Sequence, residues 1–483
     1  MNRRALLETT SFCKQISAFA CDFNHTALSS CHFAAVANTL LDTHAVAVAG
    51  WFEPAALRLR SYLKVSGALT GKRHSQAGLC RLWGEDEWVF PEAAALANGV
   101  AAHVLDFDDV SSAMRGHPSV ALWPGLLALA EARDVPGVRL ASAFVVGFEV
   151  LLKLSRAMAQ EHYALGWHST STLGTIAGAV ACSHLLSHNA QQVEASIGIA
   201  IAQCAGSRQN FGSDTKSFQA GHCNAAAVRA ALLASEGFTA GEGALDGPGG
   251  FVDLYGGHTE EVRRELALLG QGQLELVGSG VEVKKYPMCY AAHRALDGML
   301  DLCAESKLNL EDVLQIRVTS SRGGLTPLIH HRPVTGLEAK FSMEYGVVAA
   351  LADGGVTLAS FTDHAVNRLP VQNMLPRVNV AEEGDSLFPR WTRIDLTLRS
   401  GVSLVREIRT LRGSAETPLS DNELIVKADD CYRFGRSEFN GEKTLSAARD
   451  LSNTGTSAFV EAAFGSQGAQ CAKVNLNAGI VPV

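Results

Sequence analysis

Apolar residues recur at helical spacing through most of the first 270 positions of the chain. In the stretch 28–50, Val36, Leu40, Leu41 and Val46 fall near the period of an α-helix that buries one face. Alternation of apolar and polar residues, which indicates a strand, is rare in this part. The pattern therefore predicts a helical domain, with helices over residues 5–20, 28–50, 51–69, 93–105, 122–132, 141–159, 172–186, 190–205, 220–235 and 259–268.

The pattern changes at about residue 275, where runs that alternate like strands appear between helical stretches. Two such runs flank the turn Arg399-Ser400-Gly401 and predict a β-hairpin. This region therefore mixes helices and strands, and from Ser420 the chain becomes helical and polar again. The predicted strands cover 281–285, 314–319, 392–398 and 402–410, and the predicted helices cover 288–305 and 341–353.

These patterns predict a mainly α fold with an inserted α+β domain. No internal repeat divides either part further. The expected division is an all-helical domain over 1–272, an α+β domain over 273–414, a helical return over 415–466 that packs on the first domain, and a loose tail over 467–483.

Composition supports a compact, folded protein of more than one domain. Of the 483 residues, 47% are hydrophobic and only 19% are charged, a balance that is typical of globular chains. The net charge of −8, without a basic run, argues against nucleic acid as a partner. No apolar run approaches the roughly 20 residues of a membrane span, and the N-terminal stretch lacks the apolar core of a signal peptide. We therefore expect no membrane association.

Eleven cysteines are spread irregularly along the chain, without a CxxC pair. This spacing favours neither a disulfide framework nor a zinc ribbon. Reduced thiols are typical of cytoplasmic proteins, so we expect a cytoplasmic location.

The stretch 91–124 gathers residue types that move protons. An Ala-rich helix is expected to end in the sequence DFDD, which begins at Asp106, and His103 lies three positions earlier, on the same face of that helix. The polar loop 110–116 then folds His117 back towards this face. Carboxylates and imidazoles at one helix end favour general acid–base chemistry.

Two other interpretations of this stretch stay open at the sequence level. One is an acidic helix end followed by a solvated loop and a core histidine. The other is a metal site, because histidine and aspartate are common metal ligands. The spacing selects no particular metal, and we expect none to be bound; the candidate ligands are His103, Asp106, Asp108, Asp109 and His117.

Residues 166–172, with the sequence GWHSTST, lead into a helix that is expected to begin near Leu173. Ser169 and Thr170 suit the capping of that helix. A helix N-terminus also attracts a carboxylate ligand, and His168 lies beside it. Capping alone, with a packed or surface histidine, is the alternative.

Lys216 lies in the polar stretch 210–218, ahead of the predicted helix 220–235. A cation near a helix start is unfavourable against the helix dipole. Its position is therefore explained by binding of an anionic substrate, or by loss of its proton on burial. A solvated loop lysine is the alternative.

The inserted region contributes the sequence KKYPMC, in which Lys284 and Lys285 precede Cys289. Two lysines ahead of a helix can hold carboxylates. Tyr345 opens a later helix of mixed charge. The alternatives are a solvated strand end and a solvated helix face.

Several familiar signatures are missing from the sequence. It has no phosphate-binding loop, no complete dinucleotide fingerprint, no GxSxG elbow and no HExxH motif. The sequence therefore does not indicate a P-loop nucleotide-binding protein, a dinucleotide-binding enzyme, an α/β-hydrolase or an HExxH metalloprotease.

Taken together, five ordered segments resemble the MmgE/PrpD family, which includes 2-methylcitrate dehydratase, cis-aconitate decarboxylase and iminodisuccinate epimerase. The likeness covers roughly residues 90–360, and five motifs in one order make it specific. The segments are NGVAAHVLDFDD with GHPS, GWHSTSTLG, NFGSDTKSFQAGHCNAAA, KKYPMCYAAH, and EAKFSMEY with LADGGVTLASF.

The resemblance implies a large helical domain built from both ends of the chain, with an α+β lid inserted. It also implies a homodimer, an active site in the cleft between the domains, and no required cofactor. By motif match, the residues expected to be catalytic are Asp106, His117, His168 and Lys216, and those expected to bind substrate are His103, Ser169, Thr170, Lys284, Cys289 and Tyr345.

The chemistry that the resemblance implies is proton movement at a carbon next to a carboxylate. This sequence departs from the resemblance at two positions. Where animal-type cis-aconitate decarboxylases look to have a histidine and a threonine, it has Cys289 and Val110. We therefore expect a lyase that dehydrates a 2-methylcitrate-like hydroxy-tricarboxylate. The alternatives are an epimerase of an aminodicarboxylate such as iminodisuccinate, a cis-aconitate-type decarboxylase, and a non-catalytic dimer that binds carboxylates.

Overall fold

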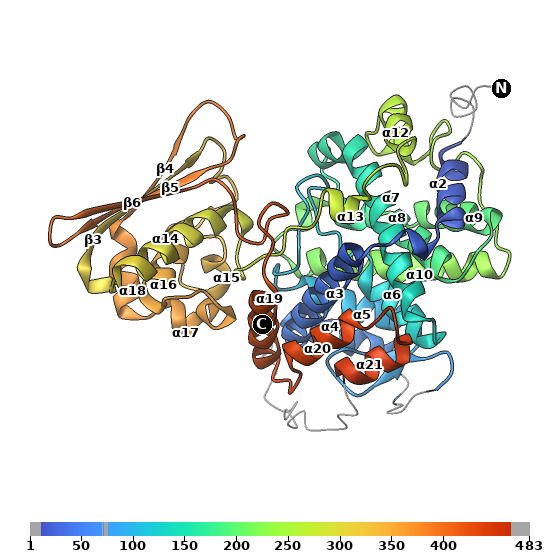
Figure 1. The fold of residues 1–483 in the computed structure, drawn as a ribbon, viewed down its shortest axis with the longest axis horizontal. Helices are drawn as coiled ribbons and strands as arrows, with labels where there is room; N and C mark the ends of the chain where they lie inside the picture. Colours follow the sequence, from blue (N-terminus) through green and yellow to red (C-terminus); the bar gives the residue numbers. More distant parts are fainter. Residues whose placement is uncertain (1–10, 70, 72–75, 465–483) are drawn as a thin grey trace. The chain divides into compact units, whose positions relative to one another are not determined.

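A computed structural model describes residues 11–69, 71 and 76–464 of the chain (Figure 1). The chain divides into two compact units: unit 1 runs up to Val281 and resumes at Leu424, and unit 2 covers Glu282–Glu423. The prediction of a mainly helical fold with an inserted α+β domain is thereby confirmed. The expected loose tail, and the first residues of the helix expected over 5–20, lie outside the described residues.

Unit 1 is built from helices and one short antiparallel pair of strands, β1 (Cys80–Arg81) and β2 (Trp88–Val89). The predicted helices are present with shifted ends. The helix expected over 51–69, for example, begins at Pro54, because proline suits a first helical position. The helices are α2 (Phe12–Asp22), α3 (Ser30–Gly50), α4 (Pro54–Val65), α5 (Pro91–His103), α6 (Trp123–Ala132), α7 (Gly137–Ala164), α8 (Ser169–Leu185), α9 (Ala190–Ile201), α10 (Asp214–Ser235), α11 (Phe251–Leu254), α12 (Thr259–Leu266), α13 (Glu275–Gly278), α19 (Asp421–Phe434), α20 (Gly441–Arg449) and α21 (Thr456–Phe464).

Helices α5 and α10 approach each other closely because both carry a glycine at the crossing. A Cβ atom on Gly99 of α5 would lie 2.8 Å from the Cα of Gly221 of α10, and a Cβ atom on Gly221 would lie 2.4 Å from the carbonyl oxygen of Leu96. Any larger side chain would force the helices apart. This contact brings the C-terminal end of α5 and the N-terminal half of α10 into one region of unit 1.

Helix α3 is long and apolar enough to cross a membrane, although polar residues interrupt its apolar runs in the sequence. In the structure, however, 78% of its apolar window is buried. Its apolar length is explained by its place in the interior of unit 1, where Val36, Leu40 and Val46 belong to the core.

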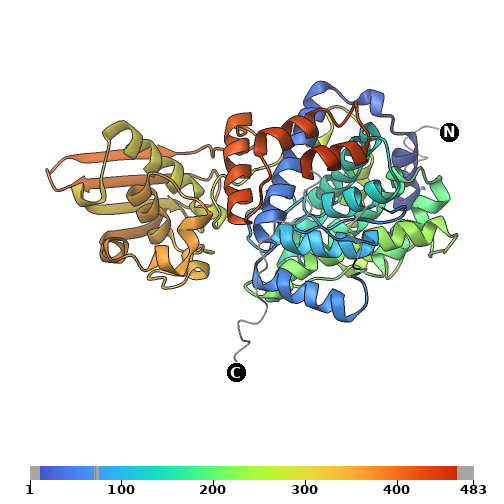
Figure 2. The ribbon, with the colours of Figure 1, turned by 90° about the horizontal axis from the view of Figure 1, so that it is seen from below.

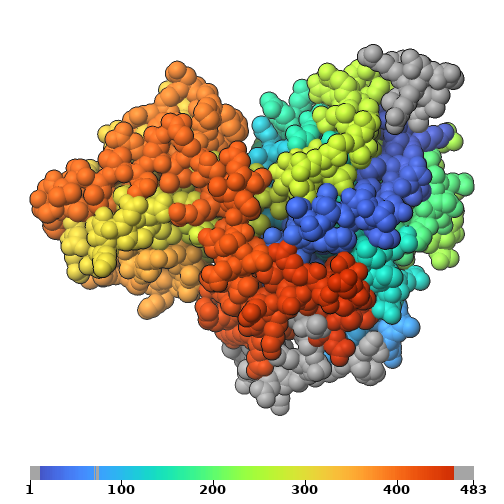
Figure 3. Space-filling model, viewed as in Figure 1, coloured from blue at the N-terminus to red at the C-terminus, as the bar shows by residue number. Residues whose placement is uncertain are grey.

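The return segment packs on unit 1, where α20 contacts α3 and α21 contacts α6. Two views of the ribbon show these helices, coloured red, beside the blue and cyan helices of the N-terminal part (Figures 1 and 2). The space-filling view shows the red segment lying directly against blue residues (Figure 3). Both ends of the chain therefore build the same unit.

Unit 2 holds a four-stranded sheet in the order β4-β3-β5-β6, in which β3 and β4 are parallel and the other pairs are antiparallel. The predicted hairpin is confirmed as β5 and β6. Helices α14 and α16 cover one face of the sheet (Figure 1), over buried residues such as Val318 and Ile394. The elements are β3 (Val313–Ser321), β4 (Val378–Glu383), β5 (Thr392–Leu398), β6 (Ser403–Ile408), α14 (His293–Ser306), α15 (Gly336–Ala339), α16 (Met343–Asp353), α17 (Asp363–Val366) and α18 (Leu369–Met374).

One strand prediction for unit 2 was wrong, and one strand was not predicted. The stretch 281–285 is not a strand: Val283 donates its N–H to the carbonyl of Gly413 at 2.7 Å, but no ladder continues from that bond. Strand β4 was missed, because its short exposed sequence shows little apolar alternation. Its partner β3 lies more than fifty positions earlier, a pairing that only the fold determines.

Candidate active site

The ends of three helices of unit 1 meet at one cluster of polar side chains. Helix α5 ends at His103, and the chain then turns at Asp106, whose backbone is left-handed with φ of 53°. The following loop is closed by a bridge between Ser111 and Gly116 and leads into His117. Aspartate tolerates the left-handed region better than most residues, so the sequence allows this sharp turn.

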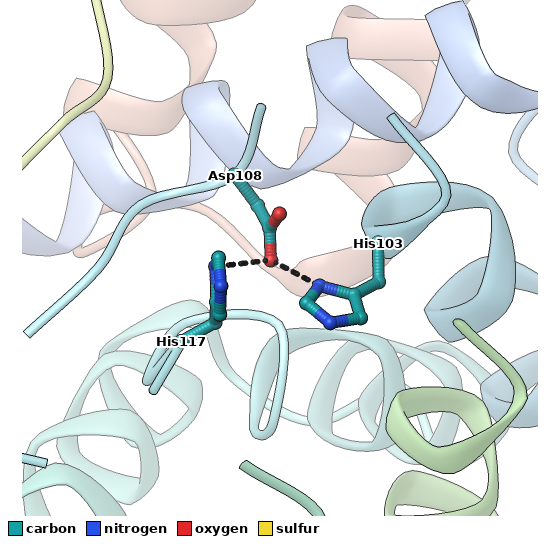
Figure 4. A group of neighbouring side chains, drawn as sticks. All are labelled: His103, Asp108 and His117. Atoms are coloured by element: carbon teal, nitrogen blue, oxygen red, sulfur yellow. Dashed lines mark hydrogen bonds and ion pairs between the residues drawn. The ribbon is translucent and has the colours of Figure 1, made fainter. Parts of the chain in front are cut away.

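The centre of the cluster is Asp108, which lies between two imidazoles (Figure 4). Its Oδ2 atom is 2.8 Å from Nδ1 of His103 and 3.1 Å from Nδ1 of His117. The side chains of His103 and Asp108 are fully buried, and the two imidazole rings meet edge to face at 4.6 Å. One carboxylate therefore orients both rings.

The three groups differ in their charge at neutral pH. Burial lowers the pKa of His103 to about 4, so this imidazole is neutral. Burial alone would raise the pKa of Asp108, but attraction and hydrogen bonding from the two histidines outweigh it and hold the pKa well below its usual value. Asp108 is therefore the ionised acceptor, and His103 donates its Nδ1 proton to it.

The second part of the cluster is an ion pair between Asp106 and Lys216. The Lys216 ammonium lies 2.5 Å from Asp106 Oδ1, and Nε2 of His117 lies 3.6 Å from the same oxygen. Part of each side chain stays exposed, 18% for Lys216 and 25% for Asp106. This pair is therefore more accessible to solvent than His103 and Asp108, whose side chains are fully buried.

His168 forms the third part of the cluster. Its ring stacks on His103 at 5.8 Å, and its Nδ1 lies 2.6 Å from Oε1 of Gln219. Gln219 gives its amide N–H to the carbonyl of Ser207, so its oxygen faces the histidine and Nδ1 must be the donor. Burial lowers the pKa of His168 well below its usual value. Its imidazole is therefore neutral, with a lone pair on Nε2 that can accept a proton.

Ser169 and Thr170 lie in the first turn of α8, not ahead of it. The predicted start at Leu173 was wrong, because the helix begins at Ser169 with His168 as its N-cap. Thr170 Oγ1 accepts the backbone N–H of His117 at 3.0 Å, so it positions the loop that carries His117. The Ser169 hydroxyl is buried beside it.

Two other predictions about this region need correction. Helix α10 begins at Asp214, so Lys216 lies in its first turn and not in a preceding loop. His103 and Asp106 do not share a helix face, because α5 ends at His103 and the backbone reverses at Asp106. The loop brings Asp108 to His103 in its place.

The remaining predicted residues lie in unit 2. Lys284 is buried, and Cys289 is half-buried, with its N–H bonded to the carbonyl of Lys340 at 3.0 Å. Tyr345 is a core residue with no exposed surface, and its hydroxyl donates to the backbone carbonyl of Ser360. Burial raises the pKa of Tyr345 to about 12. These contacts show that Tyr345 is a packing residue in the core of unit 2.

Some residues that support the cluster were not among those predicted to be catalytic or to bind substrate. Gln219 and Asp108 lie within the recognised motifs, yet their partners are visible only in the fold. Asp109 is buried and accepts the backbone N–H of Ser119 at 3.2 Å. Burial, with the nearby carboxylates, holds its pKa well above the usual value.

His103, Asp108 and His117 also form a set of possible metal ligands, with one atom from each lying within 4.8 Å of the others. Two imidazole nitrogens and a carboxylate oxygen suit zinc. The hydrogen bond between His103 and Asp108, with the ion pair between His117 and Asp108, explains how these side chains come together without a metal. A test with a chelator separates the two interpretations.

Comparisons with known proteins agree with this division of the chain. The family model of the MmgE/PrpD N-terminal domain matches residues 14–263, and that of the MmgE/PrpD C-terminal domain matches residues 286–451. The cis-aconitate decarboxylase of Homo sapiens is 30% identical over 363 residues, which cover 72% of this chain and 74% of the relative.

Two further relatives carry the same name. The cis-aconitate decarboxylase of Mus musculus is 29% identical over 371 residues, covering 72% of this chain and 73% of the relative. That of Aspergillus terreus is 23% identical over 401 residues, covering 77% of this chain and 80% of the relative.

Proposed function

This chain belongs to the MmgE/PrpD family, and on that premise we propose that it is a lyase acting on a small di- or tricarboxylate. Its chemistry is the movement of a proton at a carbon next to a carboxylate. The observation that carries the proposal is the convergence of three helix ends. They bring one ammonium group, two neutral imidazoles and an ionised aspartate into a single cluster around His117.

Lys216 is the group that meets the substrate carboxylate. Negative charge grows on that carboxylate when a neighbouring carbon loses a proton or carbon dioxide, and a nearby cation stabilises it. Lys216 is partly exposed and is already paired with Asp106. Substrate binding exchanges part of this pairing for the substrate carboxylate, whose geometry resembles that of the aspartate.

His168 and His117 move the proton. The free Nε2 of His168 accepts or returns a proton, while Gln219 holds the ring through Nδ1. His117 lies between Asp108 and Asp106, so a proton that reaches its ring is stabilised by two carboxylates. The two histidines lie on separate loops, and each can serve a different atom of the substrate.

cis-Aconitate is the first substrate to test, because the relatives named above are cis-aconitate decarboxylases. Decarboxylation needs a cation for the growing charge and a single proton donor. A second candidate is dehydration of a hydroxy-tricarboxylate such as 2-methylcitrate. The separate placement of His117 and His168 favours this candidate, because dehydration needs one base and one acid.

Proton NMR in deuterium oxide distinguishes these reactions. The purified protein is incubated separately with cis-aconitate, 2-methylcitrate, citrate and iminodisuccinate. Itaconate signals from cis-aconitate establish the decarboxylase, and a new alkene signal from a hydroxy acid establishes the dehydratase. Deuterium uptake at the α-carbon of iminodisuccinate without net loss indicates an epimerase. No change with any of the four compounds, at protein concentrations that allow one turnover, contradicts the proposed lyase activity.

A further inference from the structure

Two arginines from different loops of unit 1 lie over the same tyrosine ring. The guanidinium carbon of Arg208 is 3.8 Å from the centroid of the Tyr163 ring, and that of Arg115 is 5.7 Å from it. The face of an aromatic ring attracts a guanidinium group. Tyr163, half-buried near the C-terminal end of α7, therefore holds two cations close together.

Both arginines lie next to residues of the active-site cluster. Arg115 precedes His117 by two positions, in the loop closed by the bridge between Ser111 and Gly116. The backbone N–H of Arg208 donates to the carbonyl of Gly166 at 2.8 Å, two residues before His168.

The loop of Arg208 is tied to His168 by two further hydrogen bonds. The N–H of His168 donates to the carbonyl of Gly206 at 3.0 Å. Gln219, which orients the His168 ring, donates to the carbonyl of Ser207 at 3.0 Å. The arginine pair therefore borders the same loops that carry His117 and His168.

Neither guanidinium has an anionic partner within the described part of the chain. No carboxylate among those residues lies within ion-pair distance of Arg115 or Arg208. The Nε atom of Arg208 is buried without a hydrogen-bond acceptor. A buried donor without a partner costs free energy. A bound carboxylate would remove that cost.

The charges of the cluster explain why additional cations are needed. Asp106 and Asp108 carry two formal negative charges, against one positive charge on Lys216. An anionic substrate would meet a net negative cluster there. Arg115 and Arg208 reverse the sign of the local charge, and a guanidinium binds a carboxylate through two parallel hydrogen bonds.

We propose that Arg115 and Arg208 bind the substrate carboxylate that lies farthest from the reacting carbon. This inference rests on the proposed function, and it restricts the substrate class to molecules with at least two carboxylates. Lys216 and its neighbours hold the carboxylate at the reacting end. The arginine pair then selects di- and tricarboxylates over monocarboxylates of similar length.

Calorimetric binding of tricarballylate tests the pair. This saturated tricarboxylate has neither a double bond nor a hydroxyl group, so binding is measured without turnover. Wild type is expected to bind it, and the variants R115Q and R208Q are expected to bind roughly tenfold or more weakly. Butyrate serves as the monocarboxylate, and its weak binding should not change in either variant. The control is R133Q, which removes an exposed arginine at the end of α6.

Conservative variants and kinetics separate a direct contact from a structural role. R208K keeps the positive charge but cannot form the bidentate pair of hydrogen bonds, so it should recover only part of the affinity that R208Q loses. With a substrate that is turned over, loss of this remote contact should raise KM and leave kcat nearly unchanged. The inference is overturned if wild type does not bind tricarballylate, or if the folded double variant R115Q/R208Q binds it within twofold of wild type. Arginine-dependent binding without turnover of any compound in the NMR panel would instead contradict the proposed function alone.

Discussion

Lys427 donates a hydrogen bond of 2.9 Å to the backbone carbonyl of Phe107, a residue 320 positions earlier in the sequence. Phe107 lies between Asp106 and Asp108, so this bond ties the helical return directly to the active-site loop. The same ammonium group pairs with Asp42 of α3 at 2.5 Å and lies 4.0 Å from the Phe107 ring. Lys427 is therefore a positioning residue for the loop.

Replacement of Lys427 by methionine should destabilise unit 1. The substitution leaves Asp42 buried without its cation, and removal of one partner of a buried ion pair costs about 3 kcal/mol or more. Burial already raises the pKa of Asp42, so the carboxyl group should take up a proton in the variant. Urea denaturation measures the loss.

The double variant K427M/D42N is the matched control for this prediction. It removes both charges and should recover a substantial part of the stability. It should not recover full activity, because the bond to the Phe107 carbonyl is still missing. Full activity in K427M would contradict the positioning role.

Replacement of Asp108 by asparagine should lower kcat by about 10²-fold or more, because the amide keeps the size of the side chain and loses its charge. His117 then lacks the carboxylate that stabilises its protonated form. Asp109→Asn is the matched control next to it in the sequence. Burial holds the pKa of Asp109 well above its usual value, so an amide resembles its resting state and should cost far less activity. Equal losses in the two variants would show that Asp108 has only a structural role.

His168→Asn and Lys216→Met should each lower turnover by about 10²-fold or more, because they remove the proton acceptor and the cation at the reacting carboxylate.

Gln219→Leu acts through His168, since it removes the acceptor that sets the imidazole tautomer. Its effect should be smaller than that of His168→Asn and should shift the pH–rate profile. A His168 variant with activity close to that of wild type would refute the proton-transfer role.

Stability at mildly acid pH should depend on His44, which is fully buried in α3. Burial lowers its pKa to about 3, from 6.5 in the unfolded chain. Below pH 6.5 the unfolded chain therefore binds a proton that the folded chain does not, and the contribution to stability is lost as the pH falls. The variant His44→Phe has no imidazole at this position, so it does not lose stability in this way as the pH falls. Its free energy of unfolding should rise relative to wild type by about 1.4 kcal/mol for each pH unit below 6.5.

Glu131 supplies a control of opposite sign for the same measurement. Burial raises its pKa to about 7, so its contribution is complete below 4.5 and is lost as the pH rises through 7. Glu131→Gln should therefore gain stability relative to wild type as the pH rises over this interval.

For the His44 prediction, parallel curves of unfolding free energy against pH for His44→Phe and wild type would contradict a neutral buried histidine at position 44.

Treatment with a chelator tests the alternative interpretation of His103, Asp108 and His117. We expect dialysis against EDTA to leave activity unchanged, because Oδ2 of Asp108 already pairs with both imidazoles. Loss of activity that added zinc restores would instead identify these side chains as metal ligands.

Local sequence determined most of the secondary structure of this protein. Helical periodicity depends on neighbouring residues, so the helices of unit 1 were predictable, and so was the hairpin of β5 and β6 with its turn at Gly401. The change of pattern near residue 275 likewise indicated the inserted domain. Recognition of motifs, and not periodicity, selected His117, His168 and Lys216 as site residues.

Only the tertiary structure decided which of these side chains meet. The left-handed turn at Asp106 directs Asp108, and not Asp106, to His103. The close crossing of α5 and α10 brings Lys216 to Asp106, and the return segment brings Lys427 to Phe107. These pairs are separated by 110 and 320 positions. The physical reason is that local preference sets the elements, whereas such distant contacts depend on the packing of the whole unit.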